Sequence, residues 1–156
     1  MKWCIALLVV PALFIHLGHP AFINDEAIRA LVALEMEISD NIWVPTFFGE
    51  PYYNKPPLFN WFILFFYKTF GTANEFLTRL PAVLSLLGFG GLIYYANKKY
   101  GLKEQAFLQA LLFITCGRIL FYDSFLGLID ITFSLVIYAL FMTVYHFGKQ
   151  GRFLPL

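Results

Sequence analysis

The sequence contains little cysteine and little charge. Its two cysteines, Cys4 and Cys116, lie in apolar stretches and have neither the spacing of a metal site nor the pattern of a disulfide framework. We expect both to be small buried apolar side chains. Only 13% of the 156 residues are charged, against about 25% in soluble domains. The net charge is +1, which excludes nucleic acid as a partner.

Apolar residues are abundant instead, at 60% of the chain, and 20% of all residues are aromatic. Mean hydropathy is +0.69. The 19 phenylalanines and 9 tyrosines suit helices that face lipid and carry aromatic belts at the membrane interfaces. We therefore predict an all-α fold, a polytopic bundle of membrane helices surrounded by membrane lipids.

Four apolar stretches approach the length of about 20 residues that a helix needs to cross a bilayer. They cover residues 3–17, 78–96, 105–121 and 125–147. A fifth stretch, residues 58–67, is too short, and the prolines before it and Gly71 after it predict an interfacial or re-entrant helix. The first stretch has two interpretations, because Lys2 followed by an apolar run also describes a secretory signal peptide. No clear cleavage site follows it, which favours an uncleaved anchor.

Basic residues predict the orientation of these stretches. They form three groups: before the first stretch, between the second and third, and after the fourth, namely Lys2; Lys98, Lys99 and Lys103; Lys149 and Arg152. If all three groups are cytoplasmic, the chain must cross the membrane an even number of times between one group and the next. Four spans meet this condition, with two spans between consecutive groups. Residues 19–77 then form an external loop with amphipathic helices. We expect this loop to lie on the periplasmic face of a cell inner membrane. We also expect the chain to be the N-terminal piece of a larger protein; a short protein of this length is the alternative.

The predicted external loop begins with a helix. Asn24 is a suitable N-cap, and Asp25 and Glu26 fall in the first turn, where the helix dipole favours negative charge. Apolar residues at helical spacing continue to Ile38, which predicts an amphipathic helix against the membrane or the bundle. Arg29 lies four residues after Asp25 and can pair with it on one face. On spacing alone, a helix-start charge pair and a functional pair of carboxylates are equally good interpretations.

The second half of the loop, residues 43–57, is rich in turn-forming and aromatic residues and contains a single lysine, Lys55. A lone lysine at a membrane surface can bind a phosphate as a compact point charge. The alternative is that Lys55 extends to lipid headgroups, and the loop residues alone favour this second interpretation.

Charged residues in or beside the predicted spans are costly to bury and therefore indicate function or pairing. Arg79 and Arg118 lie near the external ends of their helices, where an extended side chain that reaches the interface also explains them. Asp123 lies in an external turn and Asp130 seven residues later, so both face one cavity if the segment is helical. The three histidines do not have the spacing of a metal site.

Five short motifs follow one another along about residues 1–145. They are Asn24-Asp25-Glu26, Trp43-Val44-Pro45, Gly49-Glu50-Pro51-Tyr52, Lys55-Pro56-Pro57-Leu58 and Arg79-Leu80-Pro81-Ala82. Their order resembles glycosyltransferase family 39, and more narrowly the bacterial aminoarabinose transferases and dolichyl-phosphate-mannose-protein mannosyltransferases. The resemblance implies the N-terminal part of a GT-C fold, with an active site at the external membrane face. It also implies a polyprenyl-phosphate sugar as donor and a lipid or protein hydroxyl as acceptor.

The resemblance also assigns roles to residues. Asp25, with Glu26 beside it, matches the family's first acidic catalytic site, where Asp25 would act as the base or orient the acceptor. The second acidic site falls on Asp123 or, alternatively, on Asp130. The candidates to bind the donor, and its phosphate in particular, are Lys55, Tyr52, Arg79 and Arg118. Lys55 is the first choice for the phosphate.

No cofactor is assigned from the sequence. A divalent metal at the carboxylates suits this chemistry, but no ligand spacing requires one. Proteins of this family have many more spans than four. Two alternatives to an enzyme therefore remain. One is a non-catalytic membrane scaffold or subunit, and the other is a small transporter with Asp123 and Asp130 along its pathway.

Overall fold

The structure is a computed structural model that describes residues 2–123 and 125–150. The predictions for Cys4, Lys2 and Arg152 concern side chains outside this description. Cys116 is described and is exposed, so the prediction that it is buried is wrong. The physical reason is local: Cys116 lies in a break between two helical segments rather than inside a continuous span.

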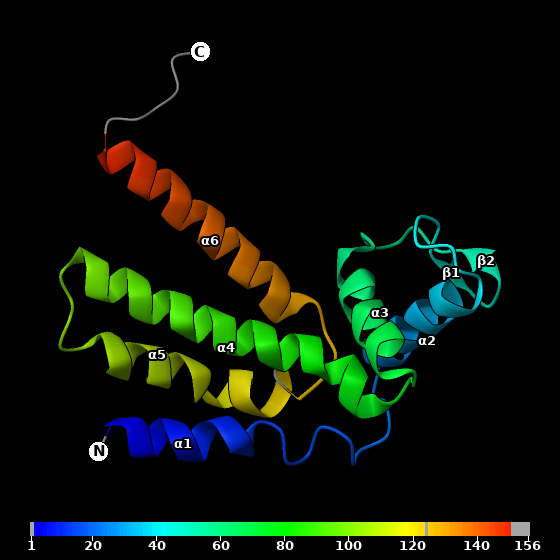
Figure 1. The fold of residues 1–156 in the computed structure, drawn as a ribbon, viewed down its shortest axis with the longest axis horizontal. Coiled ribbons are helices and arrows are strands. Elements are labelled where there is room, and N and C mark those ends of the chain that lie inside the picture. Colours follow the sequence, from blue (N-terminus) through cyan, green and yellow to red (C-terminus); the bar gives the residue numbers. More distant parts are fainter. Residues whose placement is uncertain (1, 124, 151–156) are drawn as a thin grey trace.

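The described chain is mainly helical, as predicted, with one short hairpin (Figure 1). In chain order the elements are α1 (Lys2–Ala12), α2 (Asp25–Ile38), β1 (Thr46–Phe47), β2 (Glu50–Pro51), α3 (Leu58–Phe70), α4 (Glu75–Tyr100), α5 (Ala106–Ile114), the π-helical turn η1 (Ile119–Asp123) and α6 (Asp130–Lys149). Helices α1, α5 and α4 run side by side, and α6 diverges from α4 toward its C-terminal end (Figure 1).

Two of the described helices are long and apolar enough to cross a membrane, α4 with 26 residues and α6 with 20. The other two predicted stretches contain shorter helices. In residues 3–17 the helix ends at Ala12, directly after Pro11, which lacks a backbone N–H. In residues 105–121 it ends at Ile114, and Thr115 bonds its hydroxyl back to the Leu111 carbonyl, 2.8 Å away. That all four stretches cross the membrane stays a prediction.

Helix α4 has clear start and stop signals. The Asn74 side chain accepts a hydrogen bond from the backbone N–H of Leu77, 2.9 Å away, and caps the N-terminus. Lys98 and Lys99 lie in the last turn, where the helix dipole favours positive charge. Gly101 ends the helix in a left-handed conformation with φ 111°, which costs glycine little.

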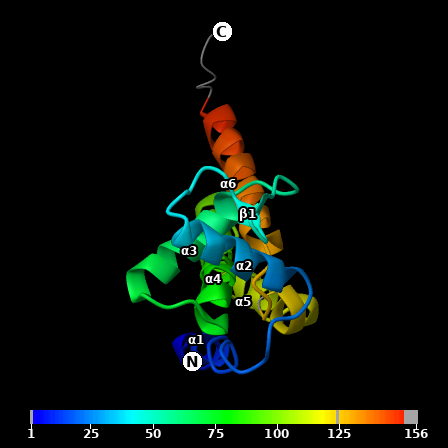
Figure 2. The same ribbon diagram turned by 90° about the vertical axis from the view of Figure 1, so that its right-hand side faces the viewer.

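Helices α2 and α3 and the hairpin form a lobe that covers the N-terminal end of α4 (Figure 2). The amphipathic face predicted for residues 25–38 packs Val32 and Met36 against Leu64 of α3. A second cluster joins α2, α3 and α4 through Ala33, Phe59, Ile63, Tyr67, Leu77 and Leu80. The short helix predicted over residues 58–67 runs to Phe70 and ends at Gly71, φ 67°, as expected.

The hairpin is attached to α2 by one carboxylate. Glu35 accepts hydrogen bonds from the backbone N–H groups of Phe48 and Gly49, at 2.7 and 3.2 Å. Both turn residues have positive φ, 55° and 79°, as a tight two-residue hairpin turn requires. The hairpin therefore fixes the path of the loop that leads from α2 to Lys55.

Candidate functional site

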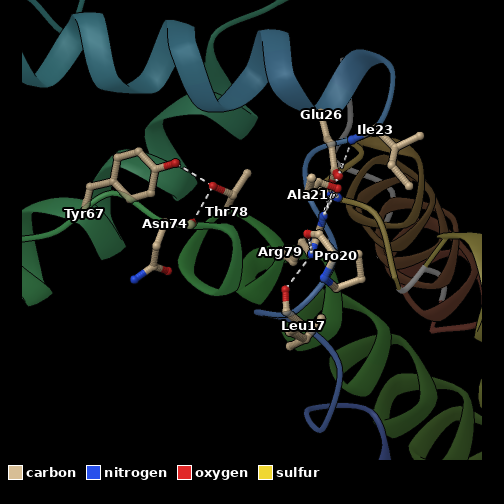
Figure 3. Close-up of polar contacts among 10 residues, drawn as sticks. Leu17, Pro20, Ala21, Ile23, Glu26, Tyr67, Asn74, Thr78 and Arg79 are labelled. Atoms are coloured by element: carbon tan, nitrogen blue, oxygen red, sulfur yellow. Dashed lines mark hydrogen bonds and ion pairs between the residues drawn. The ribbon is translucent and has the colours of Figure 1, made fainter.

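Two charged side chains that are distant in sequence form a buried pair at the junction of the lobe and α4 (Figure 3). Arg79 of α4 donates from Nε and Nη2 to the two carboxylate oxygens of Glu26 in α2, at 3.0 and 2.6 Å. Both side chains are fully buried. Arg79 also donates to the carbonyls of Leu17, Pro20 and Ala21. The pair therefore holds the segment after α1 against α2 and α4.

Glu26 also binds two further backbone groups. It accepts hydrogen bonds from the N–H of Ile23 at 2.7 Å and from the N–H of Gly127 at 2.9 Å. The second bond brings in the segment between η1 and α6, which is 101 residues away along the chain. Four segments of the chain thus meet at the Glu26 carboxylate. Because Asp25 is the neighbouring residue in α2, these contacts also fix the position of Asp25.

A pocket of about 640 Å³ opens beside this junction. It is lined by the start of α2, the loop before α3, the region of η1 and the start of α6, through Asn24, Asp25, Arg29, Lys55, Arg118, Tyr122, Asp123, Leu128, Ile129 and Asp130. Five of the eight predicted site residues lie together here: Asp25, Lys55, Arg118, Asp123 and Asp130. Pockets of this size hold small-molecule ligands, for which about 300–1,000 Å³ is typical.

Three predicted site residues do not line this pocket. Glu26 and Arg79 are enclosed and bonded to each other, as a supporting pair would be. Tyr52 is half-buried and packs against Phe47, with 5.7 Å between the ring centroids. Asn24 does line the pocket, but the prediction that its side chain caps α2 is wrong. Its φ is 54°, and its side chain makes no cap hydrogen bond.

Two ion pairs cross the pocket walls. Lys55 Nζ lies 2.6 Å from Asp25 Oδ2, and both side chains are partly exposed. The hydrogen bond and the charge of Lys55 lower the pKa of Asp25 below its ordinary value. Arg118 Nε lies 3.5 Å from Asp123 Oδ2, although 79% of the Arg118 side chain is exposed. The pocket wall therefore presents the ionised carboxylate of Asp25 and the ammonium group of Lys55 side by side.

Asp123 and Asp130 line the same pocket, but not for the reason given by helical periodicity. Residues 125–129 do not continue the helix: η1 ends at Asp123, and α6 begins at Asp130 rather than near residue 125. The connecting segment packs against α4, where Gly127 approaches Thr78 closely. This turn brings the two carboxylates together, and Asp130 is exposed with no ion pair within the described part of the chain.

Arg29 is a pocket residue that sequence reasoning missed. It was expected to pair with Asp25, but Asp25 bonds to Lys55 instead. Arg29 is only 2% exposed, and its two terminal guanidinium nitrogens have no hydrogen-bond partner among the described residues. Its place one helical turn after Asp25 was the available signal, because residues four apart share a helix face.

Among the described residues, no group of three or more histidine, cysteine, aspartate or glutamate side chains is arranged to hold a metal ion. Two of the pocket's three carboxylates are paired with a cation, Asp25 with Lys55 and Asp123 with Arg118. The chemistry open to this arrangement is binding of an anion by the cations and activation of a hydroxyl by a carboxylate.

Comparison with known proteins gives a consistent set of matches. The profile of the dolichyl-phosphate-mannose-protein mannosyltransferase family matches residues 54–154. An undecaprenyl phosphate-alpha-4-amino-4-deoxy-L-arabinose arabinosyl transferase of Pseudomonas savastanoi pv. phaseolicola is 35% identical over 101 residues, which are 64% of this chain and 19% of that protein. A second such transferase, of Pseudomonas fluorescens, is 30% identical over 124 residues, 76% of this chain and 21% of that protein.

An uncharacterized protein of Aquifex aeolicus is 28% identical over 177 aligned positions, 96% of this chain and 35% of that protein. The chain therefore spans between 19% and 35% of the length of these curated relatives. No solved structure matches.

Proposed function

The chain belongs to the dolichyl-phosphate-mannose-protein mannosyltransferase family of membrane glycosyltransferases, and we propose that its pocket forms part of a site for sugar transfer from a polyprenyl-phosphate donor. The observation that carries this proposal is the pairing of Asp25 with Lys55 on an open pocket wall. A base for the acceptor and a cation for the leaving phosphate are both needed, and here they are adjacent.

The proposed reaction is an inverting displacement at the anomeric carbon of the donor sugar. Asp25 takes the proton from the acceptor hydroxyl, whose oxygen forms the new bond to the anomeric carbon. The bond between that carbon and the phosphate oxygen breaks, and its electron pair leaves with the polyprenyl phosphate. Lys55 and Arg118 stabilise the negative charge that develops there.

The ion pair between Lys55 and Asp25 has a consequence for the order of binding. A carboxylate bonded to an ammonium group is a weak base, because the pair lowers its pKa. A donor phosphate that attracts Lys55 would release Asp25 and raise its pKa toward the ordinary value. We therefore expect the donor to bind before the acceptor is activated.

The relatives indicate which donor and acceptor to test first. Two of them are named as transferases of 4-amino-4-deoxy-L-arabinose from undecaprenyl phosphate. We propose a donor of this class, and a lipid or protein hydroxyl as the acceptor on the external, periplasmic face of the cell inner membrane. The second acidic position is Asp123 or Asp130, since both line the pocket.

The test uses the full-length protein in membranes with an undecaprenyl-phosphate-linked sugar. Native protein is expected to transfer the sugar, and Lys55→Gln is expected to reduce kcat/KM about 100-fold, as loss of one charge-stabilising group does in other enzymes. The control is Lys68→Gln, because Lys68 forms a similar pair with Asp40 at 2.7 Å outside the pocket. No transfer by the native protein would favour a non-catalytic subunit. Equal losses in both variants would contradict the role of Lys55.

A further inference from the structure

The cations around the pocket differ in what they bind. Lys55 is bonded to Asp25, and Arg118 lies against Asp123. Arg79, behind the pocket, is bonded to Glu26 and to three carbonyls. Arg29 alone among these four has two terminal nitrogens without a hydrogen-bond partner in the part of the chain that the structure describes.

Leaving a buried guanidinium unbonded is costly. Arg29 is 2% exposed, and its burial lowers the pKa of the guanidinium, although arginine keeps its charge in proteins. Tyr52, Asp25 and Asp130 act on it through space, but neither carboxylate forms an ion pair with it within residues 2–123 and 125–150. A buried charge without a partner destabilises a protein, so the presence of Arg29 at a pocket wall indicates a partner that arrives from outside.

The chemistry of that partner follows from the side chain. A guanidinium group presents a planar fork of N–H donors that matches the oxygens of a phosphate or carboxylate in pairs. Arg29 lines the same pocket as Lys55 and Arg118, so three cationic residues from three segments surround one space. Three positive groups suit a phosphoryl group, which carries more charge and more acceptor oxygens than a carboxylate.

We propose that Arg29 is the phosphate-binding residue at the inner wall of this pocket, and that its two terminal nitrogens bind a substrate phosphoryl group directly. This inference rests on the proposed function. It assigns the strongest phosphate contact to Arg29 rather than to Lys55, which can then alternate between Asp25 and the phosphate. The phosphoryl group belongs either to the lipid-linked donor or to a phosphorylated acceptor, and the experiment separates the two.

The first measurement is binding by the full-length protein in nanodiscs, with undecaprenyl phosphate and undecaprenol as probes. Arg29→Gln is expected to weaken binding of undecaprenyl phosphate about tenfold or more, as loss of charge-assisted hydrogen bonds does. Binding of undecaprenol, which lacks the phosphate, should not change. Arg29→Lys keeps the charge without the fork and should lose less affinity, and Lys68→Gln should behave as native.

The second measurement addresses the source of the phosphate. If the phosphate belongs to the acceptor, Arg29→Gln leaves binding of undecaprenyl phosphate unchanged. It then raises KM about tenfold for a phosphorylated acceptor and not for its dephosphorylated form. The inference is wrong if Arg29→Gln preserves the native affinity for undecaprenyl phosphate and the native KM for a phosphorylated acceptor. It is also wrong if binding of undecaprenol weakens as much as that of undecaprenyl phosphate.

Thermal stability without ligand separates this role from a structural one. Because Arg29→Gln removes an unpaired buried charge, the variant should melt at or above the native temperature and lose the stabilisation that undecaprenyl phosphate gives. A large drop in melting temperature with an unchanged ligand shift would overturn the inference. Native protein that binds undecaprenyl phosphate through Arg29 but transfers no sugar would instead contradict the proposed function.

Discussion

At the residue scale, Glu26 and Arg79 are the charged side chains with the most bonds in the site. Arg79 joins α4 to Glu26 and to the segment after α1, and Glu26 joins α2 to Gly127. Removing one member of a buried ion pair leaves the other charge uncompensated. The pair therefore adds polar links among α2, α4, the segment after α1 and the segment before α6.

We predict that Arg79→Gln lowers the free energy of unfolding by about 3–5 kcal/mol, the usual effect of breaking a buried pair. The measurement is thermal or denaturant unfolding of the purified full-length protein. Lys68→Gln is the matched control, since it breaks an exposed lysine–aspartate pair on the same lobe and should change stability little. Equal stability of the two variants would show that the buried pair does not support the fold.

The pKa of Asp25 gives a second residue-scale prediction. Lys55 lowers this pKa from its ordinary value of 3.8. The ion pair therefore stabilises the folded protein fully above pH 3.8, and this stabilisation is lost as the pH falls through the lowered pKa. Lys55→Gln removes the cause, and the pKa of Asp25 should rise toward 3.8.

The measurement is the pH profile of kcat/KM, whose acid limb reports the pKa of the free enzyme's base. The acid limb of Lys55→Gln should lie at higher pH than that of the native protein, whatever the loss in maximal rate. An acid limb at the same pH in both proteins would mean that another group is the base.

The sequence predicted five of the ten residues that line the pocket, but not the contacts that hold the pocket in place. Two of the five motifs contain Asp25 and Lys55, and the family resemblance added Arg118, which lies in none of them; all three line one pocket. The bond between Glu26 and Arg79 joins residues 53 apart, and no local spacing shows it. Arg29 was not assigned to the site because its spacing from Asp25 already explained it as one half of an ion pair on the helix surface.

At the element scale, the segment between η1 and α6 connects the pocket to the rest of the fold. Gly127 donates its N–H to Glu26, and a Cβ at this position would lie 3.1 Å from the carbonyl oxygen of Thr78 in α4. The glycine thus permits a close approach of two backbones. Leu128, Ile129 and Asp130 follow directly and line the pocket.

We predict that Gly127→Ala moves this segment away from α4 and destabilises the protein by about 1–3 kcal/mol, as overpacking does. It should also raise KM for the donor, because Asp130 moves with the segment. Gly91→Ala is the control, since a Cβ there meets nothing within 4 Å and alanine favours the helix. Thermal unfolding and steady-state kinetics check both effects, and a fully native Gly127→Ala variant would contradict the packing described.

Helix existence was easier to predict from the sequence than helix length. The apolar run and Gly71 predicted α3 and its end, whereas the stretch predicted to end at residue 96 continues in α4 to Tyr100. Hydropathy counts apolar side chains, whereas a helix ends where its backbone hydrogen bonds end. The stretches over residues 3–17 and 105–121 are apolar throughout, yet their regular helices end at Ala12 and Ile114.

At the scale of the whole molecule, the orientation proposed from the basic residues puts the α2–α3 lobe outside the membrane and the α4–α5 turn in the cytoplasm. The lobe covers one end of α4, and residues 98–103 lie at the other (Figure 1). We predict that, in a cysteine-free background, Asn41→Cys reacts with an impermeant maleimide in intact cells. Lys103→Cys should react only after permeabilisation. The reverse pattern would overturn the orientation.

We propose that Asp25 activates the acceptor hydroxyl in this pocket. Asp40 is a matched control for Asp25. Asp25 pairs with Lys55 at 2.6 Å and Asp40 pairs with Lys68 at 2.7 Å, but of the two aspartates only Asp25 lines the pocket. The most direct measurement is the single-turnover rate of sugar transfer by full-length Asp25→Asn and Asp40→Asn. We predict that Asp25→Asn slows transfer at least about 100-fold, as loss of a general base does, while Asp40→Asn keeps the native rate. Transfer by Asp25→Asn at the native rate would show that Asp25 is not the base.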